Sequence, residues 1–299
     1  MVRWAAVVAA LAAALAGCGG GGDSSGSGNA PAPVITLGTK NFTEQYILGE
    51  LYRQTLEKHG FKVNLKSNIG SSEIIDKALT AGSLDMYPEY TGTLLTEIAG
   101  DTRRPPSAQA AYDRAKAFEE KRGFTMLAMT PFSDSNALAA KPAYAAAHHL
   151  KTIADLRNAP GVVIGALPEF RTRFEGSVGL RDVYGVNARV KPLAFPTRYQ
   201  SLDRNAIDVL AVFTTEGQLS SGKYRVLRDS KDLFSFQNLA PVIRDDLVKK
   251  YGMRLTGPLD ALSARLTTRA MRAMNAAVDL RGEKPKDVAA RFLRGTSAG

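Results

Sequence analysis

Apolar residues in the N-terminal part of the chain alternate between short β-rich runs and stretches with helical spacing. The pattern predicts three strands, with one helix after each of the first two, and places the strands at residues 34–37, 61–65 and 85–87. Asn41 and Glu44 stand three residues apart at the start of the first helix, as a capping pair does. Pro88 is expected to end the third strand, because proline cannot donate a ladder hydrogen bond.

The rest of the chain repeats this alternation. Residues 162–165 and 207–213 are apolar runs typical of buried strands, and residues 259–293 carry apolar positions at helical spacing. Alternating strands and helices indicate βαβ units and a parallel sheet, so the expected fold class is α/β. The chain from Pro33 onward exceeds one typical domain, and its length and pattern predict two α/β lobes.

The N-terminus has the layout of a secretory signal peptide. Residues 1–17 carry one positive charge, then an apolar run, then small residues, and the run is shorter than the about 20 apolar residues that cross a bilayer. Residues 15–18 read LAGC and resemble the bacterial lipoprotein box, in which the cysteine thiol is lipidated and the cysteine becomes the new N-terminus after cleavage. Cys18 is the only cysteine, so we expect a lipidated Cys18 and no disulfide. An incidental thiol in an ordinary signal peptide is the alternative.

Composition separates a tether from the folded part. Residues 18–32 are rich in Gly and Ser and predict a flexible connection between the lipid and the domain.

The formal net charge is +10, and loss of Arg3 with the signal segment leaves +9. Because Lys and Arg are scattered and often adjoin Asp or Glu, as in residues 119–122, the charge indicates a solvated surface and argues against a nucleic-acid partner.

Candidates for catalysis or metal binding are few. The three histidines are His59, His148 and His149, and the adjacent pair points in different directions on a helix, so it cannot hold one metal. Residues 176–179 have the wrong spacing for a nucleophile elbow, and the chain has no Gly-Lys-Ser/Thr phosphate loop. We therefore expect neither an enzyme nor a cofactor or metal site.

Three segments carry binding chemistry instead. Residues 38–48 read GTKNFTEQYIL and place Lys40 at a strand-to-helix turn, where helix-start N–H groups and an ammonium favour a carboxylate. Residues 85–93 read DMYPEYTGT and place aromatic rings and hydroxyls at a second strand end. Residues 168–173 read PEFRTR and follow the strand at 162–165. Ligands of α/β sheets bind beyond the carboxyl ends of strands, where all three segments are expected to lie.

Together these motifs resemble a known family. The order G-T-K-x-F-x-E-Q-x-I-L, D-x-Y-P-E-Y-T-G-T, E-F-x-x-R and F-T-T-E-G is similar to that of the glycine betaine/carnitine/choline-binding proteins of osmoprotectant ABC importers. The resemblance runs from Ile35 to Phe292 and implies a two-lobed, type II periplasmic-binding-protein fold with the ligand in the cleft. It implies lobe 1 at residues 33–131 and 240–299 and lobe 2 at residues 132–239.

The resemblance also implies a ligand site. Lys40, Thr93 and Arg173 match the carboxylate-binding positions of the family, and Tyr90 matches a tyrosine of the aromatic cage that holds a trimethylammonium group. Phe213 matches a second cage tyrosine and keeps the ring without the hydroxyl.

Two positions depart from the family pattern. Residues 132–138 read FSDSNAL and offer Asn136 in place of a cage tyrosine, with Asp134 in place of an asparagine as a partner for a cation. Residues 234–241 read FSFQNLAP where the family has Pro-Tyr-Tyr-Ala, and offer Gln237 or Asn238, with Phe236 as a replacement ring. Each lost cation–π contact costs about 0.5–2 kcal/mol, so the loss of two weakens a betaine by about one to three decades.

The resemblance thus implies a lipid-anchored, extracytoplasmic solute-binding protein, in the periplasm or on the outer cell surface. Its expected partners are a zwitterionic or quaternary-ammonium ligand, the permease and ATPase of an ABC importer, and the membrane through the lipid. The ligand alternatives are glycine betaine bound weakly, a related betaine such as carnitine or ergothioneine, and a different amino-acid-like solute. A surface lipoprotein without a transport role is the rival class.

Overall fold

The computed structural model of the chain describes residues 32–234 and 236–295. The predicted signal segment, Cys18 and the predicted tether up to residue 31 lie outside the described residues. From Pro33 onward the chain forms one compact unit that contains two five-stranded sheets.

The first sheet defines lobe 1 and has the strand order β2-β1-β3-β10-β4. Its strands are β1 (Val34–Gly38), β2 (Lys62–Lys66), β3 (Met86–Tyr90), β4 (Phe124–Met126) and β10 (Leu239–Arg244). Strand β1 pairs in parallel with β2 and β3, whereas β10 runs antiparallel between β3 and β4. The first three predicted strands are confirmed within one or two residues, although β3 continues through Pro88 to Tyr90.

Pro88 stays within the strand because its position in the register requires no N–H toward β10. It lies opposite Pro241 in a non-hydrogen-bonded pair, since the ladder bonds fall on alternate pairs such as Thr91 with Asn238. The neighbouring pairs hold the two strands together, so the prediction that Pro88 ends the strand is wrong.

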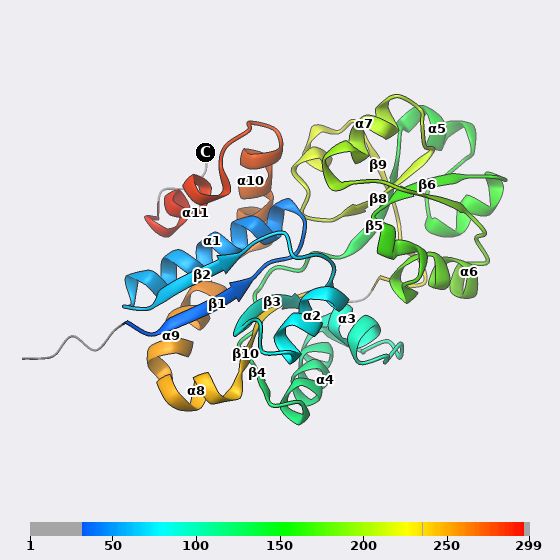
Figure 1. Ribbon diagram of the computed structural model, residues 1–299. Helices are drawn as coiled ribbons and strands as arrows, with labels where there is room; N and C mark the ends of the chain where they lie inside the picture. Colours follow the sequence, from blue (N-terminus) through cyan, green and yellow to red (C-terminus); the bar gives the residue numbers. More distant parts are fainter. Residues whose placement is uncertain (1–31, 235, 296–299) are drawn as a thin grey trace, which may run out of the picture. The chain divides into compact units, whose positions relative to one another are not determined.

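Helices cover both faces of this first sheet. One face packs against α1 (Thr43–Lys58) and the C-terminal helices α9 (Met253–Ser263), α10 (Thr268–Asp279) and α11 (Pro285–Leu293), with which it shares a buried apolar core. In Figure 1 the red helices α10 and α11 lie beside the blue helix α1. The other face packs against α2 (Ser72–Thr80), the π-helical turn η1 (Leu94–Ile98) and α4 (Ala108–Lys121). Helices α3 (Thr91–Thr93) and α8 (Asp245–Tyr251) are short and follow β3 and β10.

The second sheet defines lobe 2 and has the strand order β7-β6-β8-β5-β9. Its strands are β5 (Asn136–Ala140), β6 (Val163–Ala166), β7 (Arg189–Pro192), β8 (Val209–Phe213) and β9 (Arg225–Leu227). Strand β6 pairs in parallel with β7 and β8, whereas β5 is antiparallel to β8. Short helical segments surround the sheet: α5 (Pro142–Ala147), η2 (Ile153–Asn158), η3 (Pro168–Arg171), η4 (Phe174–Val178), α6 (Gly179–Tyr184), η5 (Phe195–Thr197), α7 (Arg198–Asp203) and η6 (Gly217–Ser221).

Two chain segments connect the lobes. The chain leaves lobe 1 after β4 and returns to it before β10. Strand β10 therefore joins the first sheet after the whole of lobe 2 has intervened in the sequence. The connections run side by side: Ser133 and Asn238 form an antiparallel bridge, and the Asp134 N–H donates to the Gln237 carbonyl at 3.0 Å. The predicted α/β class with two sheets is confirmed.

Helix α1 begins without the predicted capping pair. Its N-cap residue is Phe42, and no side chain caps the helix. The Glu44 carboxylate accepts hydrogen bonds from Tyr90, Thr215 and Asn275 instead, so the capping interpretation of Asn41 and Glu44 is wrong. Within the described part of the chain, none of the helices is long and apolar enough to cross a membrane.

Candidate functional site

The candidate site lies where strand ends of both sheets come together. Lys40 follows β1, Tyr90 ends β3 and Phe213 ends β8, all at the carboxyl ends of strands that pair in parallel with a neighbour. Arg173 follows β6 through the short helix η3. Asn136 joins them because it begins the antiparallel strand β5, where it pairs in register with Phe213.

One pocket, called the ligand pocket below, gathers most of the predicted site residues. Its empty volume is about 410 Å³, including the open mouth. Seven of the eight predicted residues line it: Lys40, Tyr90, Thr93, Asp134, Asn136, Arg173 and Phe213. Residues far apart in the sequence and carried by both lobes thus face one space.

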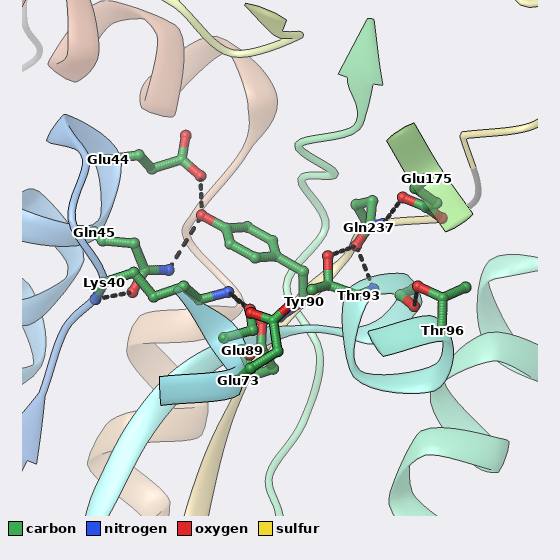
Figure 2. A network of polar contacts seen from close by, with 12 residues as sticks. Lys40, Glu44, Gln45, Glu73, Glu89, Tyr90, Thr93, Thr96, Glu175 and Gln237 are labelled. Carbon is green, nitrogen blue, oxygen red and sulfur yellow. Dashed lines mark hydrogen bonds and ion pairs between the residues drawn. The ribbon is translucent and has the colours of Figure 1, made fainter. Parts of the chain in front are cut away.

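Lys40 is buried and already has an anionic partner. Its Nζ forms an ion pair with Glu89 and donates to Ser72 Oγ at 2.9 Å, as Figure 2 shows for the ion pair. The Nζ also lies 4.5 Å from the centre of the Tyr90 ring. Burial lowers the pKa of the Lys40 ammonium below its usual value, and the charge and hydrogen bond of Glu89 oppose this effect. Lys40 therefore presents a largely compensated charge to the pocket.

Arg173 is held across the two lobes by Glu73, in the first turn of α2. Its Nε and Nη2 donate to the two Glu73 oxygens at 3.0 and 2.8 Å, which is a bidentate pair. Although burial alone raises the pKa of Glu73, the hydrogen bonds and charge of Arg173 bring it down to about 2. The Glu73 side chain remains 35% exposed, so this carboxylate has room to move into solvent.

Thr93 belongs to a polar relay at the base of the pocket. Its N–H and hydroxyl donate to Gln237 Oε1 at 3.0 and 3.2 Å, and Gln237 Nε2 donates to Glu175 Oε2 at 2.6 Å (Figure 2). Asn136 Nδ2 donates to the same Glu175 oxygen at 3.1 Å. The relay joins α3, the return connection and lobe 2, and it fixes the amide orientation of Gln237.

The return connection differs from its expected role in the site. Gln237 is 1% exposed and lies behind Thr93, outside the residues that line the ligand pocket. Asn238 donates its amide to the Thr130 and Phe132 carbonyls, and Phe236 packs against the lobe 1 core. Neither of these two residues lines the ligand pocket.

Aromatic rings form one side of the ligand pocket. Phe42, Tyr90 and Phe213 line it, with the Phe42 ring centre 6.3 Å from that of Tyr90 and 5.0 Å from that of Phe213. Phe195 of η5 stands behind them, 6.0 Å from Phe42 and 6.5 Å from Phe213. Sequence reasoning missed Phe42 and Phe195. Phe42 lies inside the first motif and could have been found, whereas Phe195 stands in a segment without a motif.

The Tyr90 hydroxyl points away from this aromatic group. It donates to Glu44 at 2.8 Å and accepts from Gln45 Nε2 at 3.2 Å (Figure 2). Burial, with Glu44 next in effect, raises the pKa of Tyr90 well above its usual value, so the phenol stays neutral. Tyr90 therefore has only its ring left to offer a ligand.

Asp134 and Glu44 are buried close to this ring. Asp134 accepts the Thr215 N–H at 3.0 Å, and Glu44 accepts the Thr215 hydroxyl at 2.5 Å and the Asn275 amide at 2.9 Å. Burial raises the pKa of both carboxyl groups, and the charge of Glu44 raises the pKa of Asp134 further. The environment thus favours protonation of this pair, which reduces the negative charge of Asp134 toward the pocket.

No group of three or more His, Cys, Asp and Glu side chains in the described residues is placed to hold a metal ion.

The acidic partners Glu73 and Glu89 were absent from the predicted site. Glu89 lies in the second quoted motif, but only the folded register shows that it faces Lys40, 49 residues away in sequence.

Comparison with known proteins gives the family. Residues 33–295 match the family model described as the substrate binding domain of ABC-type glycine betaine transport systems. A glycine-betaine-binding protein of Pseudomonas aeruginosa is 32% identical over 276 residues, covering 88% of this chain and 88% of that protein. The Helicobacter pylori ergothioneine transport permease/ergothioneine binding protein EgtU is 29% identical over 263 residues, covering 87% of this chain and 47% of EgtU.

Solved structures agree on the fold. A crystal structure of a glycine betaine/carnitine/choline ABC transporter protein has a TM-score of 0.69 at 24% identity, covering 88% of this chain and 98% of that chain. Lactococcal OpuAC in its closed, glycine betaine-bound conformation has a TM-score of 0.65 at 13% identity, covering 88% of this chain and 96% of that chain. The predicted resemblance and the two-lobed periplasmic-binding-protein fold are confirmed.

Proposed function

Since this chain belongs to the family of substrate-binding domains of ABC-type glycine betaine transport systems, we propose that it captures glycine betaine or a related quaternary-ammonium zwitterion outside the cytoplasm. We further propose that it is anchored to the membrane through a lipid on Cys18 and hands its ligand to the permease of an ABC importer.

One observation carries the proposal: cationic side chains and aromatic rings from both lobes line the same pocket. Arg173 supplies a guanidinium for a carboxylate, and Phe42, Tyr90 and Phe213 supply ring faces for a methylated ammonium. Because the guanidinium and the ring faces line one pocket, the pocket suits a small ligand that carries both a carboxylate and a methylated ammonium.

Arg173 is the cation that can exchange its partner. Glu89 is completely buried with Lys40, and separating a buried pair leaves an uncompensated charge at high cost. Glu73 is partly exposed and can turn to water when a ligand carboxylate takes its place on Arg173. Lys40 and Thr93 then contribute polar contacts from lobe 1.

The rings serve the other end of the ligand. A quaternary ammonium has no N–H donor, so it gains little from a carboxylate's hydrogen-bonding geometry and much from ring faces. Because Tyr90 and Phe213 come from different lobes, a cation between them contacts both lobes at once. Such contacts stabilise the closed state, which we propose the permease recognises.

The test is a ligand panel measured by thermal shift and calorimetry on the purified protein. It contains glycine betaine, choline, carnitine, proline betaine, ergothioneine and several amino acids. A ligand at about a hundred times its Kd adds about 2.7 kcal/mol, which raises Tm by about 5–10 °C in a domain of this size. Stabilisation by a quaternary ammonium compound is the expected result.

Arg173→Ala identifies the site. We expect a loss of affinity of about tenfold to a hundredfold for a carboxylate-bearing ligand, because a charge-assisted bidentate contact disappears. Arg157→Ala is the control, since Arg157 is an exposed arginine of lobe 2 away from the pocket. Unaltered affinity in Arg173→Ala removes Arg173 from the site, and silence of every compound in the panel favours a lipoprotein without a transport role.

The lipid anchor has a separate test. Cells that express the chain are fractionated with and without Cys18→Ser, and membrane association is followed by immunoblot. We expect the wild-type chain in the membrane fraction and the variant in the soluble extracytoplasmic fraction. Equal distribution of the two contradicts lipidation at Cys18.

A further inference from the structure

Two buried carboxyl groups, those of Asp134 and Glu44, lie beside the Tyr90 ring. Asp134 lines the ligand pocket and is 5% exposed, whereas Glu44 is 2% exposed and accepts the Tyr90 hydroxyl at 2.8 Å (Figure 2). Both groups also bind Thr215, just beyond the end of β8: Asp134 accepts its N–H at 3.0 Å, and Glu44 accepts its hydroxyl at 2.5 Å. One residue of lobe 2 thus holds the two carboxyl groups together, and they are called the acid pair below.

The hydrogen bonds of the acid pair bring in no cation. In the described part of the chain its partners are neutral groups, and neither carboxyl group forms an ion pair with Lys or Arg. Helix α10 contributes the neutral Asn275 amide, which donates to Glu44 at 2.9 Å, and one turn later Asp279, which accepts the Thr43 hydroxyl at 2.6 Å. The acid pair is therefore buried without a positive partner.

The charged groups nearby are already paired with each other. Lys40 Nζ lies 4.5 Å from the centre of the Tyr90 ring but forms an ion pair with Glu89. Glu216 accepts a hydrogen bond from the Arg198 guanidinium at 2.6 Å. Each of these two cations has a carboxylate of its own, so neither neutralises the acid pair.

A buried pair of this kind retains a proton. Removing two negative charges from water without a counter-charge is costly, and two carboxyl groups at one site do not both ionise readily. Burial, with the charge of Glu44 next in effect, raises the pKa of Asp134 well above its usual value. In the empty pocket the acid pair therefore keeps a proton to a higher pH than exposed carboxyl groups do.

We propose that the ligand's methylated ammonium is the counter-ion that the acid pair lacks, and that its arrival releases a proton from Asp134. A cation on the Tyr90 ring comes close to Asp134, because both side chains line the ligand pocket. The O–H bond of the protonated carboxyl group breaks, its electron pair stays on the carboxylate, and the proton passes to water or buffer. The inference rests on the proposed function, since it requires a permanent cation at the rings.

The direction of the pH dependence follows from this exchange. The complex holds the proton more weakly than the empty protein does, so binding releases the proton and affinity rises with pH. Each unit by which the cation lowers the pKa of the acid pair raises affinity by up to about tenfold. Kd should therefore fall as the pH rises above the ordinary range of carboxyl pKa values, and level off once the empty protein has lost the proton.

Calorimetric titration at two pH values tests the proposal, with glycine betaine and choline as probes. A quaternary ammonium does not titrate, and choline has no carboxylate, so its profile is independent of a ligand carboxylate at Arg173. We expect Kd for each probe that binds to be at least about fivefold lower at about pH 8 than at about pH 5.5. At an intermediate pH, titrations in two buffers of different ionisation enthalpy should report the release of about 0.5–1 proton per ligand.

Asp134→Asn removes the titrating group at nearly constant shape. Asparagine is also what the family pattern has at this position, so the variant is expected to fold. Its Kd should change by less than about twofold between the two pH values, and its binding should release no proton. Glu119→Gln is the matched control and should keep the pH dependence, because Glu119 is a buried carboxyl group of α4 outside the ligand pocket, and burial raises its pKa to about 7.

The outcomes separate this inference from the proposed function. A wild-type Kd that does not vary with pH, a pH dependence that persists in Asp134→Asn, or its loss in Glu119→Gln overturns the assignment of the proton to Asp134 and leaves the proposed function standing. Binding of either probe by Asp134→Asn at the higher pH shows that this variant is folded. Failure of both probes to bind the wild-type protein at either pH contradicts the proposed function and the inference that rests on it.

Discussion

Replacement of Glu73 by Gln should strengthen ligand binding. In the structure the Glu73 carboxylate occupies Arg173 in a bidentate pair, at 3.0 and 2.8 Å from its nitrogens. A ligand carboxylate that uses Arg173 must displace this group or sit beside it. Glu73→Gln keeps the size of the side chain but removes the charge that competes for the guanidinium.

The magnitude follows from the distance and the exposure. A ligand carboxylate on the same guanidinium lies near Glu73, and two like charges about 4 Å apart repel by about 1 kcal/mol in water. Because the Glu73 side chain is 35% exposed, the water-like value is the appropriate one. About 1 kcal/mol corresponds to about a fivefold change, so Kd should fall by about threefold to tenfold in Glu73→Gln.

Isothermal titration at low and at high salt measures this change. The gain should shrink as salt rises, because screening weakens the repulsion between partly exposed charges. Glu57→Gln is the matched control: Glu57 also pairs with an arginine, Arg53, and its side chain is 40% exposed, but it lies on α1 outside the pocket. Equal or weaker binding by Glu73→Gln refutes the reasoning and shows that Glu73 positions Arg173 for the ligand.

Two further predictions concern stability. Burial raises the pKa of Glu119 from 4.5 to about 7. The folded state therefore binds this proton more tightly than the unfolded state does. The proton's contribution to the free energy of unfolding is fully present below pH 4.5 and is lost as the pH rises through about 7. Glu119→Gln should therefore remove about 2–3 kcal/mol of the decline in unfolding free energy between pH 5 and pH 8, measured by urea denaturation; an unchanged pH profile contradicts the burial argument. In Gly92→Ala the new Cβ meets Gln237 Nε2 at 2.6 Å and the Phe236 carbonyl oxygen at 2.7 Å, so the variant should lose about 1–3 kcal/mol and bind ligand more weakly. Gly257→Ala in α9, with only Met253 Cε at 3.6 Å, should gain about 0.5–1 kcal/mol, and equal stability of the two variants excludes crowding at Gly92.

The positions of the binding residues could be predicted from sequence because parallel strands share an edge. Lys40 and the segment that holds Tyr90 were expected at strand ends, so the strand pattern was enough to place them near one site. Phe213 was expected there only from the family resemblance, which also supplied the roles of Tyr90 and Arg173. The strand pattern and the resemblance together therefore predicted the residues that line the pocket.

The internal partners of these residues could not be predicted in the same way. Glu73 is 100 residues from Arg173, and Glu89 is 49 residues from Lys40, so their pairing depends on how the lobes and strands are placed. Glu44 illustrates the same limit. Its local spacing favoured a cap, but a buried network with Tyr90, Thr215 and Asn275 took its carboxylate. Long-range contacts override local propensity where a side chain is buried.

Strand β10 shows the corresponding limit for the fold. Residues 239–244 contain Pro241, and proline in a central strand costs a ladder hydrogen bond, so local rules favour an edge. The strand nevertheless lies between β3 and β4, because Pro241 forms a non-hydrogen-bonded pair with Pro88 and needs no N–H on that side. On the other side its carbonyl still accepts the Leu127 N–H at 2.9 Å, just past the end of β4. Only the register of strands far apart in the sequence reveals this arrangement.

The paired charges also determine what kind of ligand the pocket can select. Arg173 and Lys40 are each neutralised by a carboxylate, and burial favours the protonated form of Asp134. The ligand pocket therefore does not require an anion, and a carboxylate alone gains only the difference between itself and Glu73 on Arg173. Under the proposed function, we therefore expect most of the binding free energy to come from the contact of the ligand's cation with Phe42, Tyr90 and Phe213. A zwitterion should then bind more tightly than a simple carboxylate, and a cation held between rings of both lobes should stabilise the closed state.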